Sequence, residues 1–386
     1  ASSDGIRLYG EYGSGGSPSI QLINLSLKGN SVFRLSGNSV LDESIIEVDN
    51  AEWQLFPDVS LGSAPHTKTL KSTSGVLNPG TITYLSDASN GANATTQANT
   101  VGFAGGEVVY NVEAGVNVDL TSDTVSGSGD FVKDGAGQLL FKGGHNASTL
   151  IKAGRLNLGS GSSLADSKSV TINGGATFDL DVSDVIGSIS GTGDIELASG
   201  VTLSAGADNS STTFDGVISG DGGFTKQGTG TLSFSGAAPN AYTGATSVEA
   251  GTLNLSGGSG LADASALSVS SGATFDLDVS DVIGSISGVG DIDLASGVTL
   301  SAGADNSSTT FDGVIKGDGG FTKQGTGTLI FSGAAPNAYT GATSVEAGTL
   351  KFSGGSGLAD TSALSVSSGA TFDLDVSDVI GSISGV

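Results

Sequence analysis

Short runs in which apolar and polar residues alternate recur along the whole chain. Examples are TLNL, TFDL, DIEL and TLSF, each preceded closely by a glycine. Alternation turns one side of a strand toward an interior and the other toward water. Glycine permits the positive φ angles that tight corners require. The pattern therefore predicts many short β-strands joined by tight turns.

The apolar positions that open these runs are spaced at a nearly constant interval. Leu253, Phe275, Val298 and Phe321 follow one another at 22, 23 and 23 residues, and Leu350 follows Leu329 by 21. In the first part of the chain, Asn50–Leu55 repeats Asn30–Leu35 at a distance of 20. A coil of about 20 residues with two or three short strands is one turn of a parallel β-helix. We expect an all-β, elongated solenoid with ladders of Leu, Val, Ile and Phe inside.

A longer repeat of 97 residues lies on top of this interval. The segment from Phe178 to Glu249 matches that from Phe275 to Glu346 at 68 of 72 positions. The exceptions are Thr192/Val289, Glu196/Asp293, Ser219/Lys316 and Ser233/Ile330. A unit that can be copied in tandem contacts mainly its neighbours, as in a one-dimensional stack.

These repeats suggest a division of the chain. Residues 1–125 read as a diverged N-terminal part of the β-helix, with an irregular excursion near 63–100 that contains two prolines and a polar run. Residues 126–386 read as the repeat β-helix, with 97-residue units starting at 153, 250 and 347 and the last one truncated.

Composition narrows the functional classes. The 64 glycines and the 37% hydrophobic content would suit a disordered chain, but disorder does not produce regular alternation. There is no cysteine, which excludes disulfides and thiolate metal sites. The formal net charge of −25 argues against binding to nucleic acid or anionic lipid. No cofactor is expected.

The segment from Gly222 to Leu255 carries a specific composite motif. It combines GGFTKQGTGTLSF with an AYTGATSV loop and a final AGTLNL; the motif recurs at Gly319–Phe352 and more weakly at Asp130–Leu158. It resembles the passenger-associated transport repeat of Gram-negative autotransporters. The resemblance covers about two thirds of the chain, from Asp130 onward.

The resemblance implies a right-handed parallel β-helix displayed on the outer surface or secreted. Such proteins also carry a signal peptide and a C-terminal outer-membrane β-barrel, and because neither is recognised here we interpret the sequence as a passenger fragment. Many acidic, repetitive passengers of this family act as adhesins in aggregation, biofilm formation and host attachment. The partner would be a second copy on a neighbouring cell or a protein or glycan ligand on a host surface. The alternative is a structural stalk for an effector domain outside this sequence.

The sharpest acidic motif is DLDVSD. It contains Asp179, Asp181 and Asp184, and it recurs with Asp276, Asp278 and Asp281. Aspartates two apart lie on the same side of a strand and could offer oxygens to calcium. A solvated outer face explains the same residues, and the spacing is not that of an EF-hand or of the nonapeptide calcium repeat.

Catalytic constellations are weak. A serine protease needs a histidine and an acid, but His66 and His145 both follow the glycine-rich turn Gly13–Pro18 that could hold a nucleophile. A polysaccharide-acting β-helix is a third interpretation, in which paired carboxylates or an arginine would act. The carboxylates recur in near-identical copies, and the arginines lie far apart, so we expect no enzyme.

Aromatic residues are the remaining candidates for binding, since aromatic rings can stack on sugars or anchor a protein partner. Trp53, Tyr84 and Tyr110 lie in the N-terminal third, and Tyr242 and Tyr339 lie in the repeated PNAYTGAT loop. An interior position that matches Phe33 is the alternative for Trp53.

Overall fold

The computed structural model describes the backbone of a defined part of the chain: residues 24–28, 32–35, 45–49, 52–55, 69–71, 80–84, 93–96, 100–103, 107–120, 124–127 and 130–385. Side chains are described over 109–118 and 130–385. All regular structure in these residues is β-strand, and all pairing is parallel, so the predicted parallel β-helix is confirmed. Over the same residues, no helix is long and apolar enough to cross a membrane.

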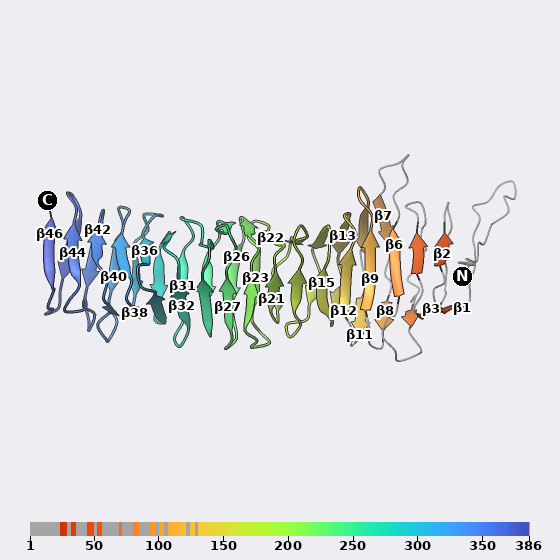
Figure 1. The fold of residues 1–386 in the computed structure, drawn as a ribbon, viewed down its shortest axis with the longest axis horizontal. Coiled ribbons are helices and arrows are strands. Elements are labelled where there is room, and N and C mark those ends of the chain that lie inside the picture. The colour runs from red at the N-terminus through yellow and green to blue at the C-terminus, as the bar shows by residue number, and fades with distance from the viewer. Residues whose placement is uncertain are drawn as a thin grey trace. The chain divides into compact units, whose positions relative to one another are not determined.

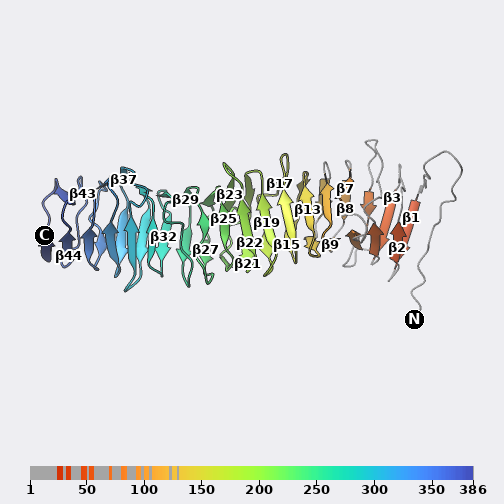
Figure 2. The same cartoon turned by 90° about the horizontal axis from the view of Figure 1, so that it is seen from above.

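The chain forms two compact units, unit 1 (Ala1–Ile186) and unit 2 (Gly187–Val386). Each consists of stacked coils, and several of their strands are labelled in Figures 1 and 2. In both units successive strands along the chain fall on different sheets, and each strand pairs with one in the next coil.

Unit 1 has three parallel sheets. The first has the order β1 (Asn24–Lys28), β3 (Ile45–Asp49), β5 (Thr69–Lys71), β8 (Thr100–Phe103), β11 (Thr124–Gly127), β14 (Gly144–His145) and β17 (Ser163–Leu164). The second has the order β2 (Val32–Leu35), β4 (Glu52–Leu55), β6 (Gly80–Tyr84), β9 (Glu107–Val112), β12 (Asp130–Asp134), β15 (Ser148–Ile151) and β18 (Val170–Ile172). The third has the order β7 (Asn93–Thr96), β10 (Asn117–Leu120), β13 (Gln138–Phe141), β16 (Arg155–Leu158) and β19 (Thr177–Leu180). The last strand of the unit, β20 (Asp184–Ile186), lies beside β17.

The diverged N-terminal part follows the coil pattern where it is described. Phe33 on β2 is the register partner of Trp53 on β4, which confirms the 20-residue coil predicted there. Within the predicted excursion near 63–100, β5, β6 and β7 pair in parallel with strands of the neighbouring coils. Its other residues lie outside those described.

Unit 2 has three faces, which we number. Face 1 consists of β21 (Ile189–Gly191), β24 (Thr212–Phe214), β27 (Thr231–Phe234), β30 (Thr252–Leu255), β32 (Thr274–Leu277), β35 (Asp291–Leu294), β38 (Val314–Gly317) and β41 (Ala338–Tyr339). Face 2 consists of β23 (Thr202–Ala205), β26 (Gly223–Lys226), β29 (Thr246–Val248), β31 (Leu267–Val269), β34 (Ile286–Gly288), β37 (Thr309–Phe311), β40 (Thr328–Phe331), β43 (Thr349–Phe352) and β45 (Thr371–Leu374). Face 3 begins with β22 (Asp194–Leu197), β25 (Ile218–Gly220) and β28 (Ala241–Tyr242), and continues with β33 (Asp281–Ile283), β36 (Thr299–Ala302), β39 (Gly320–Lys323), β42 (Thr343–Val345), β44 (Ala363–Val366) and β46 (Ser382–Gly385).

In the described part of the chain, face 3 has no strand between β28 and β33, and two side chains supply hydrogen bonds there. Asn240 accepts the Ile218 N–H through Oδ1 at 2.8 Å and donates through Nδ2 to the Gly260 carbonyl at 3.1 Å. The Asp281 carboxylate then accepts the Leu261 N–H at 2.9 Å. Asn240 and Asp281 thus supply hydrogen bonds that a regular strand would have made with its backbone.

Coil length varies more than the sequence intervals suggest. Leu253 pairs with Phe275 and Leu329 with Leu350, as their spacing predicts. The next partner of Phe275 is Ile292, 17 residues on, and not Val298, which precedes a strand of face 3. The difference arises because the turns between strands differ in length.

The interior is apolar and contains rows of aromatic rings. In unit 2, Phe224 lies 5.3 Å from Phe234 between ring centroids, and Phe234 lies 6.2 Å from Phe214. All three side chains are buried, and the same contacts recur 97 residues later. Burying one such side chain stabilises the fold by about 1.5–3 kcal/mol.

Candidate binding surface

The outward side chains of unit 2 carry an acidic pair beside an amide. Asn254 on β30 donates its Nδ2 to Asp276 at 3.1 Å and to Asp278 at 2.9 Å. Burial raises the pKa of Asp276, and the charges of Asp278 and Asp293 raise it further. The Asn254 amide thus holds the Asp276 and Asp278 carboxylates by hydrogen bonds.

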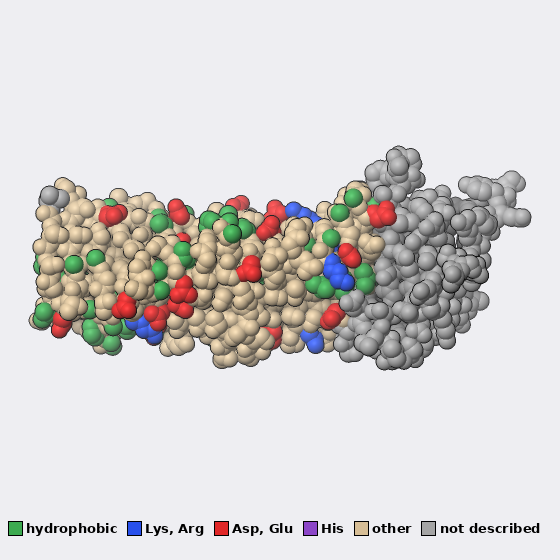
Figure 3. Space-filling view, in the orientation of Figure 1, with side chains coloured by type: hydrophobic (Ala, Val, Ile, Leu, Met, Phe, Trp, Pro, Cys, Tyr) green, Lys and Arg blue, Asp and Glu red, His purple; other side chains and the backbone are tan. Residues whose placement is uncertain are grey.

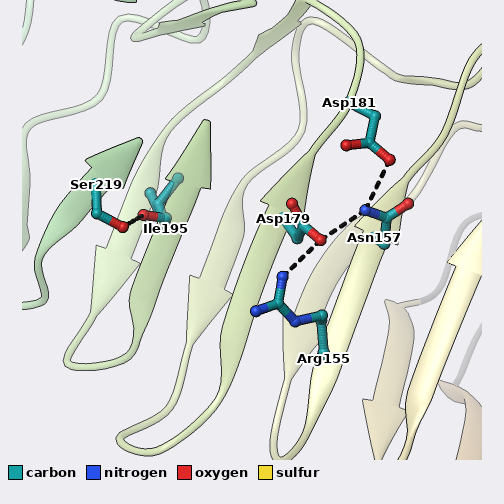
Figure 4. A network of polar contacts seen from close by, with 6 residues as sticks. All are labelled: Arg155, Asn157, Asp179, Asp181, Ile195 and Ser219. Carbon is teal, nitrogen blue, oxygen red and sulfur yellow. Dashed lines mark hydrogen bonds and ion pairs between the residues drawn. The ribbon is translucent and has the colours of Figure 1, made fainter. Parts of the chain in front are cut away.

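Unit 1 builds the same arrangement with one more cation. Asn157 donates to Asp179 at 2.6 Å and to Asp181 at 3.1 Å, and the Arg155 guanidinium lies 2.6 Å from Asp179 (Figure 4). In the third copy, Lys351 takes the amide's place and pairs with Asp373 at 2.9 Å and Asp375 at 2.5 Å. The residue that donates to the acidic pair thus differs between copies, whereas the two aspartates of the pair are present in all three.

The third aspartate of each motif lies elsewhere. Asp184 is on β20 and Asp281 on β33, in a different sheet from Asp179 or Asp276. Each accepts a backbone N–H, from Leu164 or Leu261, and burial raises the pKa of both carboxyls to about 6. The spacing that suggested calcium ligands does not bring the three carboxylates of a copy together. Across the described residues, no group of three or more His, Asp or Glu is placed to hold a metal ion.

The tyrosines proposed for binding lie inside the coils where they are described. Tyr110, Tyr242 and Tyr339 are 1%, 0% and 0% exposed. The hydroxyl of Tyr242 lies 2.7 Å from that of Thr246, and Tyr339 repeats the contact with Thr343 at 2.7 Å. A surface role for these three residues is therefore corrected: their rings fill the interior. The side chains of Trp53 and Tyr84 lie outside those described.

Sequence reasoning missed a set of buried lysines. Lys133, Lys226 and Lys323 are 0% exposed, and each ammonium donates to three backbone carbonyls. For Lys226 these belong to Gln227 (2.6 Å), Gly228 (2.8 Å) and Ala250 (3.1 Å), so it joins two turns of successive coils. Burial lowers the pKa of Lys226 to about 8. The sequence did contain the signal, since the lysine comes two residues after an inward phenylalanine.

A polar corner covers this lysine. We call Asp208, Asn209, Thr229 and Glu249 corner A; they lie on three stacked turns that lead from face 2 to face 1. Asn209 Oδ1 accepts the Thr229 N–H at 2.9 Å, and Asp208 Oδ1 accepts the Ser210 N–H at 2.9 Å. Asn209, Thr229 and Glu249 are exposed. Corner A thus combines Asp208 and Asn209, which are held by hydrogen bonds to backbone N–H groups, with the exposed side chains of Thr229 and Glu249.

Charge is spread over the surface. On the side drawn in Figure 3, acidic side chains are distributed over the described part and do not gather in one place. Unit 2 holds 20 Asp and Glu against four Lys and no Arg. Two of these lysines are buried, and Lys316 and Lys351 pair with acids. The accessible surface of unit 2 is therefore strongly negative.

Comparison with known proteins agrees with this architecture. Residues 224–255 and 321–352 match the family described as passenger-associated-transport-repeat. Both matches begin at a buried phenylalanine, Phe224 or Phe321, and contain a buried lysine and tyrosine. Within the parallel β-helix, residues 224–255 and 321–352 are thus two segments similar to this repeat.

A curated relative extends the similarity. The chain is 32% identical over 181 residues to the adhesin BmaC autotransporter of Brucella suis biovar 1 (strain 1330). The match covers 45% of this chain and 5% of the relative, so the chain spans a small part of that protein's length.

Proposed function

We propose that this chain is an adhesin-type autotransporter passenger, exposed on or secreted from the surface of a Gram-negative bacterium. The observation that carries the proposal is the similarity to an autotransporter adhesin, on a fold in which residues 224–255 and 321–352 match the passenger-associated transport repeat. Binding, and not catalysis, is its role.

The mechanism is contact through outward side chains held on a stiff scaffold. Interior residues are nearly invariant between the copies of unit 2, whereas residues 192/289, 196/293, 219/316 and 233/330 differ and none of them is buried. Each polar contact is weak, but many along one scaffold give avidity. Attachment, aggregation and biofilm formation would all follow from such contacts.

Display of the chain on a non-aggregating bacterium tests the proposal. The chain is fused to an unrelated autotransporter translocator, and settling of the cells and retention on matrix-protein and glycan surfaces are measured. Cells that carry the translocator alone are the control. Increased settling or retention is expected; equal behaviour of the two strains at equal surface levels would favour the stalk interpretation.

A further inference from the structure

The two copies within unit 2 do not face the same way. Every strand of the first copy has its 97-residue equivalent on another face: β24 and β37 lie on faces 1 and 2, β26 and β39 on faces 2 and 3, and β25 and β38 on faces 3 and 1. The repeat contains thirteen strands, β21 to β33, and one further ladder position at Gly260–Leu261. Fourteen positions at three per coil make four and two-thirds coils. Equivalent turns of the two copies therefore lie at different corners of the coils.

One of the repeated turns differs in sequence between the units. In unit 1 it consists of residues 173–176, which lead from β18 to β19 and read Asn-Gly-Gly-Ala. Its equivalents in unit 2, residues 270–273 and 367–370, read Ser-Ser-Gly-Ala. The former leads from face 2 to face 1, and the latter from face 3 to face 2. The turn thus occurs three times, and only the copy in unit 1 contains an Asn-Gly pair.

The three turns share their backbone geometry. The Ala176 N–H donates to the Asn173 carbonyl at 3.0 Å, and both equivalents in unit 2 repeat this bond at 3.0 Å. The third residue of each turn is a glycine with a φ between 77° and 82°. The second residue has no positive φ, and it is serine in both copies of unit 2. The turn therefore does not require glycine at position 174.

The Asn173 amide and the Gly174 N–H lack partners that would hold them apart. Both residues are exposed. Neither the Asn173 side chain nor the Gly174 N–H forms a hydrogen bond with another described residue. The backbone nitrogen that follows an asparagine can attack its side-chain amide carbon, and glycine leaves that approach open because it has no Cβ.

Two other exposed asparagines are held in place. Oδ1 of Asn209, at corner A, and Oδ1 of Asn306, its equivalent in the next copy, each accept a threonine N–H at 2.9 Å. The following N–H groups, of Ser210 and Ser307, donate to aspartate side chains at 2.9 Å. Both the amide and the attacking nitrogen are thus restrained at these residues, in contrast to Asn173.

We propose that Asn173 is a site of spontaneous deamidation, which modifies the turn of unit 1 and leaves the equivalent turns of unit 2 unchanged. The Gly174 nitrogen loses its proton and bonds to Cγ of Asn173. The Cγ–Nδ2 bond breaks, and Nδ2 leaves with that proton as ammonia. Water, the sole co-reactant, then opens the cyclic succinimide. Cleavage of the bond from nitrogen to Cγ gives aspartate, and cleavage of the bond to the α-carbonyl carbon gives isoaspartate.

The two products change the turn differently. Aspartate adds one carboxylate and keeps the main chain as it is. Isoaspartate routes the main chain through Cβ and Cγ, so the carbonyl that accepts the Ala176 N–H becomes part of a free carboxylate. The next N–H, of Thr177, donates to Gly154 in the preceding coil at 2.8 Å and begins β19, whose Asp179 belongs to the network in Figure 4. Isoaspartate should therefore loosen the start of β19.

The site is tested on the purified full chain, incubated at mildly alkaline pH and mapped by peptide mass spectrometry. Asn173 should deamidate at least about tenfold faster than Asn209 or Asn306, because glycine permits the backbone approach. The matched control is Gly174→Ser, which places at this position the serine of both unit 2 turns and should slow the reaction at Asn173 by about tenfold. The chain's other Asn-Gly pair, Asn90 and Gly91, lies outside the described residues, and the map separates it from Asn173.

The change in the turn is measured by hydrogen exchange. The incubated chain should exchange faster than the fresh chain at Ala176 and Thr177, in proportion to its content of isoaspartate. Freshly purified Asn173→Asp supplies the added charge without the altered main chain, and it should exchange as the unmodified chain does.

Three results would overturn the proposal. Deamidation at Asn173 no faster than at Asn209, or equally fast in Gly174→Ser, would show that the turn keeps the Gly174 nitrogen away from the amide. Equal exchange in the incubated chain and in Asn173→Asp would show that isoaspartate leaves the start of β19 intact. These measurements use the purified chain, so they do not depend on the outcome of the cell-settling assay.

Discussion

Tyr242 and Thr246 lie four residues apart in the chain, and their hydroxyls meet at 2.7 Å in the interior of unit 2. In unit 1 the same spacing joins His145 Nε2 to Thr149 Oγ1 at 2.9 Å. The imidazole is stacked on Phe131 with ring centroids 4.8 Å apart. His145 is thus a packed substitute for the repeat tyrosine and not a catalytic group.

Because His145 occupies the position of the repeat tyrosine, the stability of unit 1 should be sensitive to acid. Burial lowers the pKa of His145 from 6.5 to about 4. Between these values the unfolded chain binds more protons than the folded chain, so stability falls as the pH drops from 6.5 toward 4. The free energy of unfolding is lower by about 3 kcal/mol once His145 is protonated in both the folded and the unfolded chain. We expect His145→Tyr to remove this decrease, measured as the difference in free energy of unfolding between pH 7.5 and 4 relative to the unsubstituted chain.

The reverse change serves as the control. Tyr242→His should introduce the same acid sensitivity into unit 2. Asp184 and Asp281 act in the opposite sense, since their raised pKa values add stability as the pH falls from about 6 toward 3.8, but they are common to all the variants. Parallel pH profiles for His145→Tyr and the original chain would contradict the prediction.

The buried Lys226 should stabilise the two turns that it joins. Lys226→Met leaves three carbonyls without their donor, and we expect a loss of about 2–4 kcal/mol. Hydrogen exchange should accelerate most across residues 226–251. The matched control is Lys316→Met, which removes a partly exposed lysine paired with Asp291 and should cost less than about 1 kcal/mol. Equal losses in the two variants would show that the carbonyl contacts contribute nothing.

The identity of the donor beside each acidic pair should set the pKa of the acids. Asn254→Lys gives the second copy the donor of the third, and a nearby ammonium favours the ionised carboxylate. The pKa of Asp276 should therefore fall, as followed by carboxyl-carbon NMR titration. Asn254→Gln keeps a neutral donor and should leave the titration near that of the original chain. An unchanged Asp276 titration in Asn254→Lys would be evidence against the contact.

Gly216 should tolerate no side chain, because a Cβ there would overlap the carbonyl oxygen of Gly193 in the preceding coil. We expect Gly216→Ala to separate the two coils locally and to raise hydrogen exchange in β22 and β25. Gly200→Asn is the control: it has a φ of +76°, which Asn adopts more readily than most residues, and open space around its Cβ. Protection in Gly216→Ala equal to that of the control would mean that the backbone shifts without cost.

The fold could be predicted because the alternation is local. In a strand such as TLNL, the alternation predicts that Leu253 and Leu255 point inward, and both are buried. The directions of the copies could not be predicted in the same way. They depend on the number of ladder positions in the repeat, and one position, at Gly260–Leu261, has no alternating strand to mark it.

The candidate site was predicted only in part. The outward aspartates were recognised, but their partners were not, because Asn157 and Asp179 are 22 residues apart and meet only through the stacking of coils. The repeat tyrosines were assigned to a surface loop although Tyr242 lies two residues after Asn240, and alternation would have placed both inside. Their burial could have been found by extending the strand pattern into the loop.

The fractional number of coils per repeat has a consequence for how such a chain can change. Near-identical copies invite unequal recombination, which adds or removes a whole copy at a time. Each such event would lengthen or shorten the stack by four and two-thirds coils. The coils beyond the change would then be rotated about the coil axis by one face. A change of three copies would restore the original direction of the faces. Variation in the number of copies therefore also changes the direction in which the outward side chains beyond the change point.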